Sequence, residues 1–77
     1  MNKSEFIRQI EDILEIDENT LTGAEALENY EGWDSLALLS VIAMADEQFD
    51  IVLEGEALQN VNTTDDLVAL VKDYLTT

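Results

Sequence analysis

The chain of 77 residues contains no cysteine, no histidine and no proline. It therefore lacks disulfides, thiolate nucleophiles, imidazole bases and the commonest transition-metal ligands. Any chemistry has to use hydroxyl or carboxylate groups. A domain this short buries only roughly 60% of the surface of its unfolded chain, which leaves little room for a walled catalytic cavity. We expect a single domain over residues 1–77 that is not an enzyme.

Basic residues are also scarce, with three against eighteen acidic ones, and the formal net charge is −15. Phosphate groups would be repelled, which excludes nucleic acid as a partner. A basic protein surface is the natural complement, because opposite charge speeds encounter and selects partners. A merely solvated acidic surface is the alternative interpretation. The hydrophobic fraction of 47% excludes only a disordered acidic tail.

The sequence has neither a basic-then-apolar signal peptide at its start nor an apolar run long enough to span a membrane. We therefore expect a soluble, cytoplasmic protein without a membrane partner. We also expect a free-standing monomer with no fused enzyme, since the chain starts and stops at its predicted helices.

Apolar residues repeat with helical spacing in two long segments. The first predicted helix runs from Ser4, as its N-cap, to about Ile16. The second begins at Asp34 or Ser35, both strong caps, and runs to about Phe49. Residues 17–33 lose this periodicity, which predicts a long loop with a short turn of helix around residues 24–27. Loops of this length are uncommon in compact domains and tend to be functional.

Two further helices follow in the sequence. Residues 56–59 form a short predicted helix, and the last helix begins at Thr63 or Thr64. Thr63 and Asp66 resemble a capping box in its acid-containing form. Because strand-like alternation is limited to residues 49–53, the sequence predicts an all-α fold. We expect a small four-helix bundle of three main helices plus a short third helix, with a long first loop.

The second predicted helix carries apolar residues on two sides. The side without a polar residue is predicted to contact the core: Leu38, Val41, Ile42, Ala45 and Phe49. The opposite side mixes apolar and acidic residues: Leu36, Leu39, Ser40, Ala43, Asp46 and Glu47. Such a mixed face suits transient docking, with aliphatic anchors and orienting carboxylates. Alternatively, the long loop covers Leu36 and Leu39; we expect exposure for Leu36 and leave both readings open for Leu39.

Ser35 lies beside a residue that can do the same structural work. Serine is a good helix cap, but Asp34 can cap equally well, so one of the two is spare. A spare hydroxyl at a helix N-terminus is a plausible site for a phosphate ester. Asp34-Ser35-Leu36 also resembles the nucleophile motif of some serine hydrolases. That reading fails because the chain has no histidine, and Lys3 and Lys72 lie near its ends.

Acidic residues raise the question of a metal site. Residues 17–19 begin like an EF-hand loop and Glu28 fits its last position, but Thr22 stands where that loop needs glycine. We expect no dedicated metal site. Loose divalent binding that relieves self-repulsion is expected at the end of the second helix, from Asp46, Glu47 and Asp50.

Several segments together resemble the acyl carrier protein family. The resemblance centres on Gly32-Trp33-Asp34-Ser35-Leu36, which is similar to the family's Asp-Ser-Leu attachment motif. The helix end Asp46-Glu47-Gln48-Phe49-Asp50-Ile51 is similar to an "EEFDI"-like sequence of the family. Val61-Asn62-Thr63-Thr64 is similar to its approach to the last helix. The motifs lie in register with the length, acidity, helix order and long first loop, and cover nearly the whole chain.

The resemblance implies that Ser35 accepts 4′-phosphopantetheine from coenzyme A through a separate, magnesium-dependent phosphopantetheinyl transferase. The thiol of this arm would carry acyl groups as thioesters, which places the reactive sulfur in the cofactor. The implied partners are this transferase and the enzymes that load and transfer acyl groups, with basic docking surfaces. The pathway would be fatty-acid, polyketide or specialised lipid or polysaccharide biosynthesis.

The resemblance also implies roles for other residues. Asp34 helps present Ser35 to the transferase, and the motif includes Leu36. The positions that match partner contacts are Leu36, Leu39, Ser40, Ala43, Asp46 and Glu47, although the family often has an acid where Ser40 stands. Acyl chains can fold back between the helices of the family, beside Leu38 and Ile42.

Trp33 and Asp34 bear on the branch of the family. Trp33 looks more like carriers of specialised pathways, or else it simply packs the loop onto the bundle. Asp34 argues against peptidyl carriers. The alternative to a carrier is an acidic helical adaptor with the same fold that is never modified and binds one basic partner through the Leu36 face.

Overall fold

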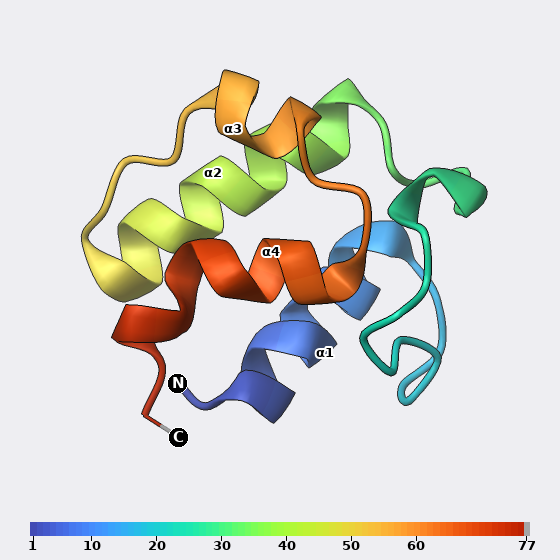
Figure 1. The fold of residues 1–77 in the computed structure, drawn as a ribbon, viewed down its shortest axis with the longest axis horizontal. Coiled ribbons are helices and arrows are strands. Elements are labelled where there is room, and N and C mark those ends of the chain that lie inside the picture. The colour runs from blue at the N-terminus through green and yellow to red at the C-terminus, as the bar shows by residue number, and fades with distance from the viewer. Residues whose placement is uncertain (77) are drawn as a thin grey trace.

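The structure, a computed structural model, describes residues 1–76 and is all-helical (Figure 1). Its helices are α1 (Lys3–Leu14), α2 (Ser35–Phe49), α3 (Gly55–Gln59) and α4 (Thr64–Val71), with 3-10 turns at Leu27–Asn29 and Lys72–Tyr74. The described part of the chain contains no β-strand, which confirms the predicted all-α, four-helix fold with a short third helix and a long first loop. None of the described helices is long and apolar enough to cross a membrane.

The N-cap of α1 lies two residues before the predicted one. The side chain of Asn2 accepts a hydrogen bond from the Glu5 N–H at 2.8 Å, and the Glu5 carboxylate accepts one from the Asn2 N–H at 3.1 Å. This capping box makes Asn2 the N-cap, so the prediction of Ser4 was wrong. The helix ends at Leu14 because Glu15 adopts a left-handed conformation with φ of 59°.

Helix α4 begins as predicted, with Thr63 as its cap. The Thr63 hydroxyl accepts a hydrogen bond from the Asp66 N–H at 3.2 Å. The Asp66 carboxylate accepts from the N–H groups of Asn62 and Thr63 at 3.1 and 3.2 Å. These bonds favour the charged carboxylate and lower the pKa of Asp66. The capping box at Thr63 is therefore confirmed, and it fixes the direction in which α4 leaves the preceding segment.

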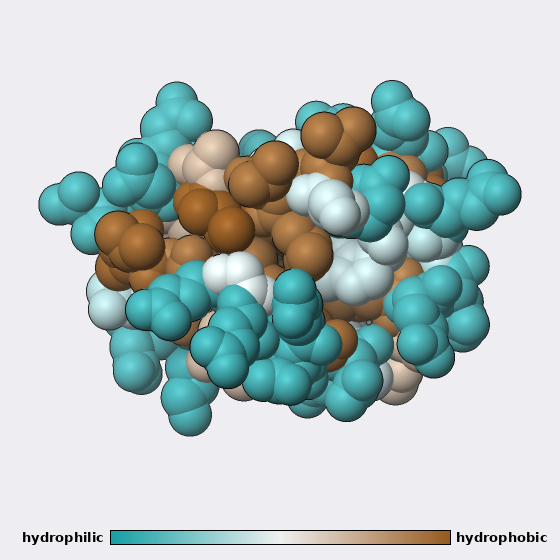
Figure 2. Space-filling model, turned by 90° about the horizontal axis from the view of Figure 1, so that it is seen from above, coloured by the Kyte–Doolittle hydropathy of each residue, from teal (hydrophilic) through white to brown (hydrophobic). Residues whose placement is uncertain are grey.

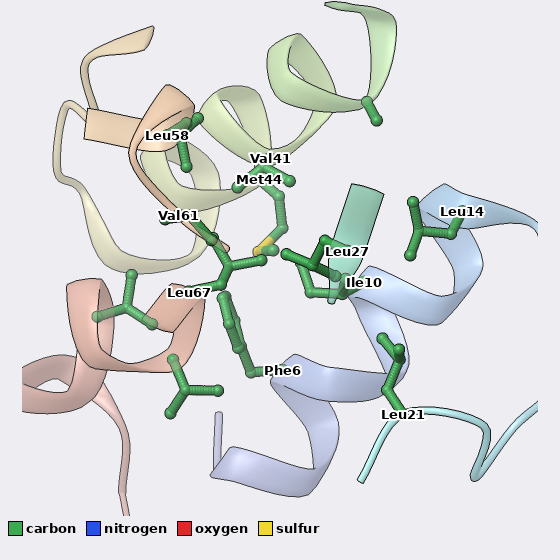
Figure 3. Close-up of a cluster of buried hydrophobic side chains, with 13 residues drawn as sticks. Phe6, Ile10, Leu14, Leu21, Leu27, Val41, Met44, Leu58, Val61 and Leu67 are labelled. Carbon is green, nitrogen blue, oxygen red and sulfur yellow. The ribbon is translucent and has the colours of Figure 1, made fainter. Parts of the chain in front are cut away.

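The core lies where α1, α2 and α4 meet. Figure 3 shows Phe6 pointing from α1 toward Leu67 of α4, with Met44 of α2 and Leu27 of the loop beside it. The core cluster of buried apolar side chains is Phe6, Ile10, Leu14, Leu21, Leu27, Ala37, Val41, Met44, Leu58, Val61, Leu67, Val68 and Val71. Every helix and the first loop contribute to it, so the loop is part of the packed structure.

The buried side of α2 differs from the predicted one. Val41 and Ala45 are buried as expected, but Leu38, Ile42 and Phe49 are only partly buried. Ala37 and Met44, which the prediction left out, complete the buried strip. The reason is that α2 contacts both α1 and α3. The residues of α2 that these helices bury therefore lie between the predicted core side and the predicted mixed side.

The first loop is tied to the start of α4. The N–H of Leu27 donates to the Asn62 carbonyl at 2.9 Å, and the Asp65 N–H donates to the Gly23 carbonyl at 2.8 Å. Residue 26 is consequently extended and pairs with residue 63 in an isolated β-bridge. The predicted turn of helix at residues 24–27 is therefore displaced to Leu27–Asn29.

Two carboxylates hold the first half of this loop. Glu25 accepts hydrogen bonds from the Thr22 hydroxyl and from the N–H groups of Gly23 and Thr22, which lowers the pKa of Glu25 to about 2. Glu11 is buried in α1, and one of its oxygens accepts from the Leu21 N–H at 2.9 Å. The loop thus has defined anchors at both α1 and α4.

Candidate functional site

The predicted attachment residue is the first residue of α2. Asp34 is the N-cap, and its Oδ1 accepts a hydrogen bond from the Ala37 N–H at 3.0 Å. Ser35 follows in the first helical position and is exposed. Of the two candidate caps, Asp34 does the capping, which leaves the Ser35 hydroxyl free of that role.

The segment before α2 is held against the end of α1. A Cβ on Gly32 would lie 2.7 Å from the carbonyl oxygen of Leu14 and 3.0 Å from its Cα, so only glycine allows this approach. The Trp33 N–H donates to the Tyr30 carbonyl at 3.0 Å, and the Asp34 N–H donates to the Gly32 carbonyl at 3.0 Å. Trp33 is half-buried and packs against the core, as its packing interpretation predicted. This tight turn sets where α2 begins.

We expect Gly32→Ala to destabilise the protein by about 1–3 kcal/mol, the usual effect of forcing extra volume into a packed contact. The atoms that the new methyl group meets belong to the Leu14 backbone, which cannot rotate away. Thermal unfolding followed by circular dichroism measures the effect. Gly55→Ala is the matched control, because a Cβ there meets nothing within 4 Å. It should raise stability slightly, by about 0.4–1 kcal/mol. Equal melting temperatures for both variants would contradict the close approach.

The mixed face of α2 is open to solvent. All six residues predicted on it are exposed: Leu36, Leu39, Ser40, Ala43, Asp46 and Glu47. Leu36 is 73% and Leu39 61% exposed, so the long loop covers neither of them. We call these six residues the α2 face. Figure 2 views the molecule from the top of Figure 1, where α2 and α3 lie. This view shows hydrophobic surface bordered by hydrophilic side chains.

Sequence reasoning did not single out Val52, an apolar residue that is 82% exposed in the segment after α2. Its only signal was its place in the short alternating run of residues 49–53. The acids at this end of α2, Asp46, Glu47 and Asp50, are all exposed. Residues 1–76 contain no group of three or more acidic side chains placed to hold a metal ion. The loose divalent binding expected there therefore has no preformed site in the described residues.

The position of Ser35 suits a covalently attached phosphate group. The hydroxyl is exposed, and the 15-residue helix behind it directs free N–H groups and the positive end of its dipole toward that point. Ser4 is also exposed near a helix start, but no aspartate precedes it as a cap. Ser40 is exposed in the body of α2, away from the helix end.

One known protein family matches the four helices of the bundle. A family described as the phosphopantetheine attachment site matches residues 4–71, from α1 to the end of α4. Neither curated proteins nor solved structures gave a match. The match extends over most of the chain and includes the exposed serine at the start of α2. The chain therefore belongs to the phosphopantetheine attachment site family, whose domains bear a covalent 4′-phosphopantetheine.

Proposed function

We propose that this protein is an acyl carrier with its arm attached to Ser35. The observation that carries the proposal is an exposed serine hydroxyl at the first position of α2, with the capping role taken by Asp34. The arm supplies a thiol that holds acyl groups as thioesters. The carrier would deliver them to enzymes of fatty-acid, polyketide or specialised lipid or polysaccharide biosynthesis.

Attachment is a phosphoryl-group transfer. The Ser35 oxygen forms a phosphodiester bond with the pantetheine-side phosphorus of coenzyme A, and the pyrophosphate bond breaks to release adenosine 3′,5′-bisphosphate. The hydroxyl proton has to leave as well. The chain has no histidine to accept it, and Asp34 is engaged by the Ala37 N–H. We propose that the phosphopantetheinyl transferase supplies the base, which makes this protein the substrate in that reaction and not the catalyst.

After attachment, α2 supports the new charge. Its free N–H groups and dipole stabilise the negative phosphodiester, and the effect is confined to the first turn. Asp34 keeps that turn formed through its bond to Ala37. These two contributions hold the base of the arm in place while the rest of it projects from the helix end.

The α2 face is the proposed docking surface for partner enzymes. Leu36 and Leu39 offer exposed apolar anchors, and Asp46 and Glu47 add negative charge on the same helix. A partner with a basic surface and a shallow apolar pocket matches this arrangement. The net charge of −15 would speed encounter with such a partner at low ionic strength.

Leu36→Ala should weaken docking without weakening the fold. Because Leu36 is 73% exposed, we expect a stability change within about ±0.5 kcal/mol. We expect kcat/KM of the transferase to fall about tenfold, mainly through KM, since truncating a central anchor commonly costs more than about 1 kcal/mol. Val52→Ala is the control, because Val52 is equally apolar and exposed but lies outside the α2 face. Equal losses in both variants would argue against docking through Leu36.

The proposed function is tested by incubating the protein with coenzyme A, magnesium and a broad-specificity phosphopantetheinyl transferase. Intact-mass spectrometry should show a gain of one phosphopantetheine, and fragmentation should locate it on Ser35. Attachment at another residue would overturn the assignment of the site. An unchanged mass would favour the acidic adaptor that is never modified.

A further inference from the structure

A groove of about 230 Å³ lies between the end of α1 and the first turns of α2. Its lining residues are of two kinds. The apolar ones come from both helices: Ile13, Leu36 and Ala37. The polar ones include two acids and a hydroxyl: Glu15, Asp34 and Ser40. We call this hollow the α1–α2 groove.

The α1–α2 groove adjoins the proposed docking surface. Leu36 and Ser40 belong both to the α2 face and to the lining of the groove. These residues are four positions apart, so they lie one above the other along one side of α2. An enzyme that covers the α2 face along this side therefore also meets the groove.

Backbone contacts hold the two sides of the groove in place. The backbone of Gly32 lies against that of Leu14 with no room for a Cβ between them. The Glu15 N–H donates to the Asp12 carbonyl at 3.1 Å, and Asp34 is held by its capping bond. The two acidic residues are thus positioned on opposite sides of the groove before a partner arrives.

The lining suits a long side chain with an apolar stem and a positive end. The described residues that line the groove include two acids and no base. Their negative charges repel each other, and a positive group near both reduces that repulsion. Lysine and arginine pack their aliphatic stems on apolar surface while their charged ends stay in polar surroundings. An acidic side chain would be repelled, and an aliphatic one would leave the carboxylates unused.

We propose that the α1–α2 groove receives a lysine or arginine side chain of the phosphopantetheinyl transferase. The stem lies against Ile13 and Leu36, and the charged end contacts Glu15 and Asp34. Glu15 is then a docking residue that lies outside α2. This inference rests on the proposed function, because it requires a transferase that modifies this protein.

Glu15 can be changed without harm to the fold. It occupies a left-handed conformation with φ of 59°, where glycine is favoured, and it places a negative charge at the negative end of the α1 dipole. Glu15→Gln removes the charge and keeps the length of the side chain. We expect its melting temperature, measured by circular dichroism, to equal that of the wild type or to be slightly higher.

The kinetics of the transferase reaction test the proposal. Intact mass first verifies that the wild type gains one phosphopantetheine, so a failure of attachment is seen separately as a failure of the proposed function. For Glu15→Gln we expect KM to rise about threefold or more with kcat unchanged, the effect of losing one ion pair with the enzyme. Glu18→Gln is the matched control, because it removes the same charge from an exposed residue that does not line the groove. An unchanged KM in Glu15→Gln, or equal rises in both variants, would overturn the proposal.

Nuclear magnetic resonance locates the contact directly. Unlabelled transferase is added, without coenzyme A, to the isotopically labelled protein. The amide signals of residues 13–16 should shift together with those of α2, and the shifts at residues 13–16 should be smaller in Glu15→Gln than in Glu18→Gln. Shifts confined to α2 and the segment after it would show that the transferase does not enter the groove.

Discussion

Ser35→Ala is expected to abolish the attachment of 4′-phosphopantetheine completely. The substitution removes the only side-chain oxygen at the first position of α2, and the alanine left behind cannot form a phosphodiester. Intact-mass spectrometry after incubation with coenzyme A and the transferase should show no gain. The wild-type protein treated in parallel should be fully modified.

Two controls separate loss of the hydroxyl from loss of the fold. Ser4→Ala removes an exposed hydroxyl at another helix start and should keep the full mass gain. Because Asp34 caps α2, Ser35→Ala itself should change stability by no more than about 0.5 kcal/mol. A Ser35→Ala protein that still gains the arm would refute the assignment of the site.

Phe6→Ala is expected to cause the largest loss of stability. Phe6 is fully buried at the centre of the core, where it packs between α1 and α4 (Figure 3). Removing such a ring typically costs about 3–5 kcal/mol, out of a total of about 5–15 kcal/mol for a native domain. We expect the melting temperature, measured by circular dichroism, to fall by more than about 10 °C.

Tyr74→Ala serves as the control for the aromatic contact. The centroid of the Phe49 ring lies 6.2 Å from that of the Phe6 ring and 6.0 Å from that of the Tyr74 ring. The ring planes are tilted relative to each other in both pairs. Tyr74, however, is 49% exposed, so its removal leaves no comparable cavity. It should lower the melting temperature much less than Phe6→Ala. Similar losses would indicate that the ring contacts, and not the burial of Phe6, stabilise the core.

Local patterns predicted the helices because their signals lie within a few residues of each other. The capping box of Thr63 and Asp66 is such a signal, and so are the two strong candidate caps Asp34 and Ser35; both helix starts are as expected. The missed start of α1 was local too, since Asn2 and Glu5 form the same kind of box. What distinguishes Asn2 from Ser4 is the reciprocal bond that the Asn2 N–H donates to the Glu5 carboxylate three residues later.

Tertiary contacts account for what the sequence did not predict. Helix α2 is apolar on more than one side, so periodicity alone could not show that Ala37 and Met44 would be buried and Leu38 only partly so. The close contact between the backbones of Gly32 and Leu14 joins residues far apart in the chain, and nothing in the local sequence pattern indicates it. Ser35 could be singled out because its motif is contiguous.

The tip of the first loop offers a place to modify the protein without disturbing its packed core. Residues 17–20 are exposed, and their turn is closed by the Thr20 hydroxyl and N–H, which donate to the Asp17 carbonyl at 2.7 and 3.3 Å. The chain is anchored again directly afterwards, where the Leu21 N–H meets Glu11. A peptide tag or a fluorescent reporter inserted into this tip would extend into solvent and leave the hydrogen bond between Leu21 and Glu11 intact. The protein could thus be immobilised or followed in an assay while its arm stays accessible to enzymes.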